Sequence, residues 1–165
     1  MIFKIKKHNI DLYNTLLKLS RNIFFYKKIK LIDKFETRIY LMLFHFSLMM
    51  IVFKKKNNKF DQLEYDTLFQ NIENNLRELG LGDISVNKKM KDLNKILYDI
   101  VLKIDKNLKD EFTINDRLIL KYFSEIKSSK TDEYQLFKRY FYDFYNYCFE
   151  LSLKNMIREA INFKN

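Results

Sequence analysis

The sequence predicts an all-α fold in a single compact domain of about six helices. The 165 residues contain two glycines and no proline, whereas β-sandwiches, barrels and nucleotide-binding α/β folds depend on turns and loops rich in these residues. Apolar residues recur at helical spacing, and no alternation with a period of two indicates a strand. Because a chain of this length suits one hydrophobic core, we expect residues 1–165 to fold as one unit.

A first helix is expected over residues 9–27, where apolar residues recur at helical steps. The stripe consists of Ile10, Tyr13, Leu17 and Phe24. This spacing predicts one amphipathic helix that places the stripe against the core.

A second helix is expected from Phe35 to Lys56. It is apolar on nearly every side between Ile39 and Phe53, so it should run through the centre of the bundle. This apolar run covers 15 residues and includes His45, whereas a membrane-spanning helix needs about 20 residues. We therefore predict a buried core helix and no transmembrane segment.

A third helix is expected over residues 60–79 and a fourth over residues 84–108, joined by a tight corner. Their apolar faces are Tyr65, Phe69, Ile72, Leu76 and Leu79, and then Met90, Leu93, Leu97, Ile100 and Ile104. Gly80 is placed to end the third helix in a left-handed conformation, which a Cβ disfavours. Asp83 or Ser85 can cap the fourth helix by accepting a hydrogen bond from a free backbone N–H.

Two further helices complete the prediction. The segment 113–116 (TIND) resembles a capping box, which would open a fifth helix that ends near Ile126. Thr131 or Asp132 can cap the last helix, which we expect to continue over residues 132–163.

Basic charge is concentrated in the first third of the chain. Residues 1–60 hold 14 Lys or Arg and three acidic residues, a balance of +11, whereas residues 61–165 balance to −1. Such a field attracts ribosomal RNA or anionic lipid headgroups. The default interpretation of a charge run is nevertheless a solvated face. The abundance of Lys, Asn, Ile, Phe and Tyr is also typical of AT-rich coding DNA, which by itself raises the number of lysines. If the charge is functional, we expect one exposed side to carry Lys4, Lys6, Lys7, Lys27, Lys28 and Lys30.

Candidate catalytic groups are scarce in this sequence. His8 lies in the basic start, His45 in the most apolar helix and Cys148 on an aromatic helix face. We interpret His45 as a hydrogen-bonded core histidine rather than a metal ligand, and Cys148 as a small buried apolar residue. One cysteine and two distant histidines close no usual zinc site. We therefore expect no catalytic residue, no cofactor and no metal, and we do not predict an enzyme.

The last predicted helix is rich in aromatic residues. Its core face should consist of Phe137, Phe141, Phe144, Cys148 and Leu151. Tyr142, Tyr145 and Phe149 point elsewhere, so they must either cover a second neighbour or form an exposed patch. Since exposed aromatic patches are typical of binding surfaces, these three residues are candidate partner-facing aromatics.

One segment is more specific than helical periodicity. Residues 76–91 (LRELGLGDISVNKKMK) closely resemble the signature of the ubiquinol–cytochrome c chaperone family, in which LRE, an apolar residue and GVGD precede a valine and a basic run. Residues 65–73 are similar to the F-D, F and D-M-D elements of the family, and residues 34–45 to its R-F-D/E and L-H elements. The resemblance covers about residues 10–105.

Two positions depart from the family pattern. Asn71 stands where the family usually has Asp, and residues 97–100 (LYDI) stand where it commonly has F-Y-G-R. If the Gly-Arg pair of the family contacts a partner, this chain lacks that contact.

The resemblance implies an assembly chaperone for the cytochrome bc1 complex (complex III) that binds newly made cytochrome b at the membrane surface. The motif residues that would shape its partner surface are Leu76, Arg77, Glu78, Gly80, Gly82, Asp83, Lys88, Lys89 and Lys91. The basic first third would bind the ribosome or an anionic membrane surface. A second assembly factor is a further candidate partner. We expect no DNA partner. The residues alone leave open an alternative function, a basic helical protein that binds RNA or the ribosome.

The first residues of the chain also predict a location. They contain no apolar core of signal-peptide length, and the scarcity of Arg and the early Asp11 do not fit a mitochondrial transit peptide. We therefore expect a protein of the bacterial cytoplasm, peripheral to the inner membrane, rather than one of the mitochondrial matrix.

Overall fold

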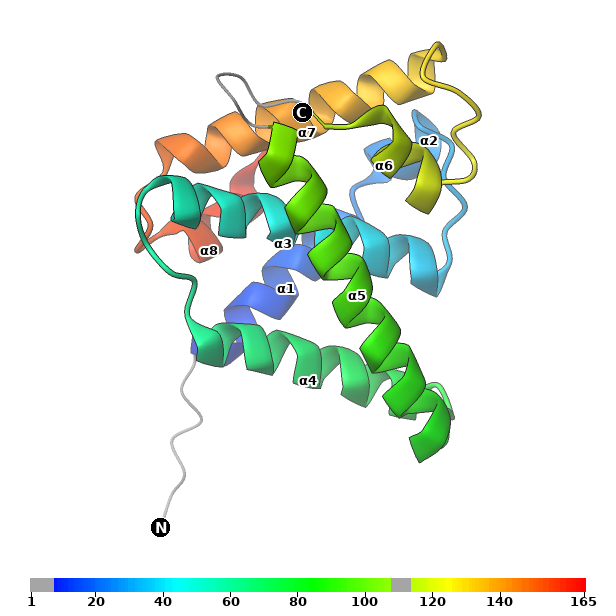
Figure 1. The fold of residues 1–165 in the computed structure, drawn as a ribbon, viewed down its shortest axis with the longest axis vertical. Helices are drawn as coiled ribbons and strands as arrows, with labels where there is room; N and C mark the ends of the chain where they lie inside the picture. The colour runs from blue at the N-terminus through cyan, green and yellow to red at the C-terminus, as the bar shows by residue number, and fades with distance from the viewer. Residues whose placement is uncertain (1–7, 108–113) are drawn as a thin grey trace.

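The most apolar helix of the chain lies at the centre of the fold. In the computed structural model, which describes residues 8–107 and 114–165, this helix is α3 (Phe35–Lys55). Every residue from 41 to 49 is buried. Around α3 pack α1 (His8–Ser20), α5 (Asp83–Asn107) and α7 (Asp132–Glu150) (Figure 1). The described residues contain helices and no strand, so the predicted all-α class is confirmed.

The length and composition of α3 would suffice for crossing a membrane, and it is the one helix of the described ranges that meets this test. However, 72% of its most apolar stretch is buried inside the protein. This burial agrees with the predicted core helix.

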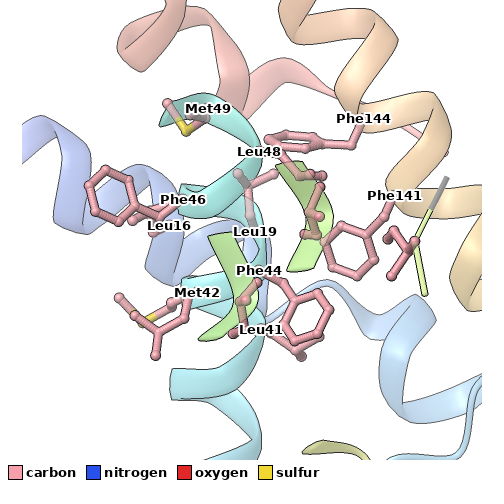
Figure 2. Close-up of a cluster of buried hydrophobic side chains, with 14 of the residues drawn as sticks. Leu16, Leu19, Leu41, Met42, Phe44, Phe46, Leu48, Met49, Phe141 and Phe144 are labelled. Atoms are coloured by element: carbon pink, nitrogen blue, oxygen red, sulfur yellow. The ribbon is translucent and has the colours of Figure 1, made fainter. Parts of the chain in front are cut away.

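Aromatic side chains of α7 pack against α3 in the core. Figure 2 shows Phe141 and Phe144 of α7 pointing toward α3. The ring of Phe141 lies 5.6 Å from that of Phe44 and 4.8 Å from that of His45, between ring centroids. The predicted core face is confirmed for Phe137, Phe141, Phe144 and Cys148, and Leu151 is half-buried just after the helix.

The predicted first helix is in fact two helices. α1 ends at Ser20, and α2 (Ile23–Lys27) begins after Asn22, whose side chain accepts a hydrogen bond from the Phe24 N–H at 3.0 Å. Asn favours such turns because its side chain competes for backbone donors. The predicted stripe is also displaced by one position. The buried leucines of α1 are Leu12, Leu16 and Leu19, whereas Tyr13 and Leu17 are half-buried and the side chain of Ile10 lies outside the described residues.

The third and fourth predicted helices correspond to α4 (Gln62–Glu78) and α5. Asp61 caps α4 by accepting a hydrogen bond from the Leu63 N–H at 2.7 Å. The apolar faces are confirmed with one exception, because Leu79 is 61% exposed. This residue is the C-cap of α4, where the helix has already ended.

The fifth helix is shorter than predicted at both ends. α6 (Asp116–Tyr122) is capped by Asn115, which accepts a hydrogen bond from the Arg117 N–H at 2.9 Å. Thr113, the expected cap, lies outside the described residues. The backbone leaves the helix at Phe123, with φ −123° and ψ 78°, and this lets Phe123 and Ile126 enter the core.

The last predicted helix also divides. Thr131 caps α7 as expected, since its hydroxyl accepts a hydrogen bond from the Tyr134 N–H at 3.2 Å. α7 ends at Glu150 instead of residue 163, and the Lys56 Nζ donates to the Leu151 carbonyl at 2.8 Å. No glycine or proline marks this end in the sequence.

After α7 the chain turns back onto the core. It forms α8 (Met156–Glu159) and a 3₁₀ turn, η1 (Ala160–Asn162), both of which pack on α1. Met156 and Ala160 are fully buried, and the Thr15 hydroxyl donates to the Ile157 carbonyl at 3.0 Å. This burial accounts for a turn that the sequence pattern alone does not predict.

Candidate partner-binding surface

The corner between α4 and α5 has the predicted glycine turn. We use "the corner" for residues 76–84. Gly80 has a φ of +91°. Its N–H donates to the Arg77 carbonyl at 2.9 Å, and the Leu81 N–H donates to the Leu76 carbonyl at 3.3 Å. These two bonds satisfy carbonyls that the end of α4 would otherwise leave free, and the left-handed φ explains the glycine.

The start of α5 differs from the expectation. The Val86 N–H donates to the Gly82 carbonyl at 2.9 Å, so Gly82 is the N-cap and Asp83 the first helical residue. Neither Asp83 nor Ser85 therefore occupies the capping position. An acidic residue in the first turn still complements the positive end of the helix. A Cβ on Gly82 would meet no atom within 4 Å, so nothing in the structure requires glycine there.

Arg77 links the two sides of the corner. Its guanidinium contacts Glu73 on α4 at 2.9 Å and Asp83 on α5. The hydrogen bonds to Asp83 and Glu73 raise the pKa of Arg77 above its usual value. Because all three groups are partly or largely exposed, the pairs stabilise the fold little, and the pair with Asp83 connects the end of α4 to the start of α5.

A pocket of about 410 Å³ opens beside the corner, between α1, α3 and the end of α4. Its apolar wall consists of Tyr13, Leu17, Phe35, Ile39, Met42 and Leu79. Its polar groups are Arg21, Arg38, Asn75 and Glu78. Asp33 holds Arg38 by two hydrogen bonds, at 2.6 and 2.8 Å. An apolar pocket with a few fixed polar groups suits a large apolar side chain of a partner.

The corner exposes three aliphatic side chains. Leu79 is 61% exposed, Leu81 36% and Ile84 87%. Leu76, by contrast, is fully buried and anchors the end of α4. Sequence reasoning missed all three exposed residues as candidate contacts and placed Leu79 in the core. The available signal was that Leu81 lies between the two glycines and Ile84 lies outside the apolar face of α5.

The three motif lysines occupy different environments. Lys88 and Lys91 are exposed, whereas Lys89 is half-buried and its Nζ lies 3.8 Å from Glu36 Oε1 on α3. Lys89 therefore helps to hold α5 on α3, and the other two face outward.

The three candidate aromatics of α7 are also divided by the structure. Tyr142 and Phe149 are each 41% exposed, but Tyr145 is 8% exposed and covers a neighbour instead of forming a patch. The Lys56 Nζ lies 5.1 Å from the ring centroid of Phe149 and shields part of it. α7 lies far from the corner, at the opposite end of the view in Figure 1.

The departure from the family pattern at position 99 has a structural use. The Asp99 carboxylate accepts hydrogen bonds from Lys103 at 2.7 Å, Lys121 at 2.8 Å and the Tyr122 hydroxyl. Burial alone would raise the pKa of Asp99, but these donors hold it well below its ordinary value. Asp99 therefore ties α5 to α6, a role that a glycine could not fill.

The buried polar groups are engaged inside the core. His45 Nδ1 donates to the Leu41 carbonyl at 2.6 Å, which leaves Nε2 to accept from the Tyr140 hydroxyl at 2.8 Å. Burial lowers the pKa of His45 to about 3 and raises that of the Cys148 thiol. The described residues contain no group of three His, Cys, Asp or Glu that could hold a metal ion. The side chain of His8 lies outside them.

Comparison with known proteins identifies the segment that contains the corner. The family model described as "Ubiquinol-cytochrome C chaperone" matches residues 27–120, more than half of the chain. The match begins later and ends later than the resemblance expected from the motif. It includes α3, α4, α5 and the first five residues of α6, and it excludes α1 and α7. No curated protein and no solved structure matches the chain.

Proposed function

The chain belongs to the ubiquinol–cytochrome c chaperone family, and from this premise we propose that it binds newly made cytochrome b at the membrane surface during assembly of the cytochrome bc1 complex. Family membership implies an assembly chaperone rather than an enzyme. The single observation that carries the proposal is the exposed corner, which lies inside the matched segment and presents aliphatic side chains next to an apolar pocket.

The corner and its pocket are the client site in this proposal. A membrane protein that has not yet assembled exposes apolar side chains, and a chaperone must offer apolar surface in return. Leu79 forms part of the pocket wall and is 61% exposed, so it can contact a client without any rearrangement of the core. The ion pairs of Arg77 fix the corner beforehand, which lowers the entropy lost on binding.

The α7 aromatics are a second candidate contact. Tyr142 and Phe149 offer less exposed apolar surface than the corner does, and they lie outside the segment matched by the family model. We therefore assign the client to the corner, and this assignment can be tested separately from the family role.

The basic first third would add attraction without specificity. Lys27 and Lys28 are exposed, and Lys30 pairs with Glu133 at 2.8 Å. Lys4, Lys6 and Lys7 lie outside the described residues. We propose that these charges concentrate the protein at an anionic membrane or at the ribosome, and that the cell compartment is the bacterial cytoplasm at the inner membrane.

The test is a pull-down of the tagged protein from detergent-solubilised native membranes, followed by identification of the bound proteins. Leu79→Ser should lower the yield of cytochrome b by at least about tenfold, as expected for loss of a central apolar contact. Leu63→Ser is the matched control, because Leu63 is 52% exposed on α4, the helix that ends just before Leu79, but lies outside the pocket. This control should retain wild-type yield.

Two results would contradict the proposal. Absence of cytochrome b from the wild-type pull-down would show that cytochrome b is not the client. Recovery of ribosomes or RNA, lost on nuclease treatment or at raised salt, would instead support the alternative function of RNA binding.

A further inference from the structure

The outward face of α5 carries a continuous stripe of exposed residues. The stripe steps by four, three, four, three and four positions through Ile84, Lys88, Lys91, Lys95, Tyr98 and Leu102. These steps place all six on one side of the helix, opposite the buried face that packs on α3 and α4. From Ile84 to Leu102 the stripe extends over about 27 Å, at 1.5 Å per residue. We call it the α5 stripe.

The lysines of the α5 stripe are free to meet an external partner. Lys88, Lys91 and Lys95 are exposed, and none of them forms an ion pair with a described residue. The neighbouring lysines of α5 are already used, since Lys89 pairs with Glu36 and Lys103 with Asp99. Like charges one turn apart destabilise a helix slightly, so an anion placed across all three lysines would be favoured.

Acidic groups do not neutralise the stripe. Asp83 is held by Arg77, and Asp99 by Lys103 and Lys121. Asp92 is exposed beside the stripe and is the remaining acidic side chain among residues 83–104. The face therefore presents a net positive charge to its surroundings.

The ends of the α5 stripe are apolar. Ile84 is 87% exposed, Tyr98 61% and Leu102 55%. Binding to an RNA backbone would use the lysines alone, and the exposed aliphatic side chains at the ends would add no affinity. A bilayer interface uses both, because lysines meet headgroup phosphates while aliphatic and tyrosine side chains enter the interfacial layer.

We propose that the α5 stripe is the face with which the protein lies on an anionic lipid bilayer, with α5 parallel to the membrane plane. Lys88, Lys91 and Lys95 contact the headgroups, and Ile84 and Leu102 insert at the two ends. This orientation brings the corner to the membrane, where the proposed function requires a client-binding surface. The inference therefore rests on the proposed function. It assigns lipid contact to α5, independently of any contribution from the basic first third.

The absence of tryptophan from the chain allows a sharp test. In Ile84→Trp, the single indole should shift its emission to shorter wavelength when vesicles of equimolar phosphatidylcholine and phosphatidylglycerol are added. Leu63→Trp is the matched control, because Leu63 is 52% exposed on α4 and lies outside both the stripe and the basic first third. It should show no shift. An unshifted indole at position 84 in vesicle-bound protein would overturn the orientation.

Charge reversal supplies the second arm. In vesicle flotation, the triple variant Lys88→Glu, Lys91→Glu and Lys95→Glu should bind at least about 100-fold more weakly, as three lysines near an anionic leaflet imply. The control triple Lys127→Glu, Lys154→Glu and Lys164→Glu changes the net charge equally and should stay within about threefold of wild type. Equal losses in both triples, or loss of RNA binding with unchanged flotation, would overturn the inference. Vesicles contain no client, so failure here is distinct from failure to capture cytochrome b in detergent.

Discussion

The α3–α7 core and the α4–α5 corner use apolar side chains in opposite ways. In the core, Phe44, Phe137 and Phe141 are fully buried and in ring-to-ring contact, and the buried ring of Phe144 contacts that of His45. At the corner, Leu79 and Ile84 remain largely in water. The aromatic helix looks like a binding surface by composition, but most of its rings are interior. The comparison teaches that local backbone geometry at helix ends, more than aromatic content, decides which apolar residues stay available to a partner.

Mutations in the two regions should therefore have different effects on stability and on client capture. Changes in the core should alter stability and leave client capture per folded molecule unchanged. Changes at the corner should do the reverse, except where they strain the backbone.

The largest expected effect is in the core. Phe141→Ala should lower the free energy of unfolding by about 3–5 kcal/mol, because it removes a buried ring and leaves a cavity. Phe149→Ala, on the exposed side of the same helix, should cost less than about 1 kcal/mol, chiefly through its contact with Lys56. Chemical denaturation of both variants measures the difference. Similar losses in the two would show that burial does not distinguish these rings.

The second effect is a pH dependence of the core. Folded His45 has a pKa of about 3, below the ordinary value of about 6.5 in an unfolded chain. As the pH falls, the unfolded state takes up the proton first, so the folded state loses stability below about pH 6.5. Between pH 6.5 and pH 4.5 the loss should be about 2–3 kcal/mol.

The matched variant for this effect is His45→Gln, which removes the titrating group. Denaturation at a series of pH values should give a shallower slope for the variant over that window. Carboxylates with lowered pKa values, such as Asp33 and Glu133, act at more acidic pH and are shared by both proteins. Identical slopes would show that His45 is not held neutral in the fold.

A smaller effect is expected at the two glycines of the corner. Gly80→Val should cost more than about 1 kcal/mol, because a β-branched side chain disfavours the φ of +91°. Gly82→Ala should stay within about 0.5 kcal/mol of wild type, since its Cβ meets no neighbour and the unfolded chain becomes less flexible. A loss below about 0.5 kcal/mol for Gly80→Val would contradict the assigned turn.

The smallest effect on stability is expected at Arg77. Arg77→Met removes both ion pairs of the corner while keeping an apolar stem, and exposed pairs contribute little to folding. The melting temperature should stay near that of wild type, whereas the yield of captured cytochrome b should fall because the corner loosens. Unchanged capture would show that the ion pairs do not prepare the site.

Helical spacing predicted much of this fold because a long amphipathic segment can bury its apolar face only as a helix with that face against the core. α3, α4 and α5 follow their apolar faces, and Gly80 marks the corner because its left-handed φ requires that residue type. The breaks at Asn22 and after Glu150 were missed, since tertiary burial of Met156 and Ala160 decides the latter and no residue type signals it.

The site was predicted by resemblance rather than by periodicity. The motif identified the corner, but it could not reveal that Leu79 lines a pocket formed with Tyr13 and Met42, because these residues meet only in three dimensions. Nor could it separate Lys89, which pairs with Glu36, from the outward Lys88 and Lys91.

Site-specific photo-crosslinking during cytochrome b synthesis tests most directly the claim that the corner binds the client. A photoreactive side chain would replace Leu79 in one variant and Tyr142, which is 41% exposed on α7, in another. We predict a crosslink to cytochrome b from position 79 and none from position 142. A crosslink from position 142 alone would contradict the assignment and place the client on the aromatic helix.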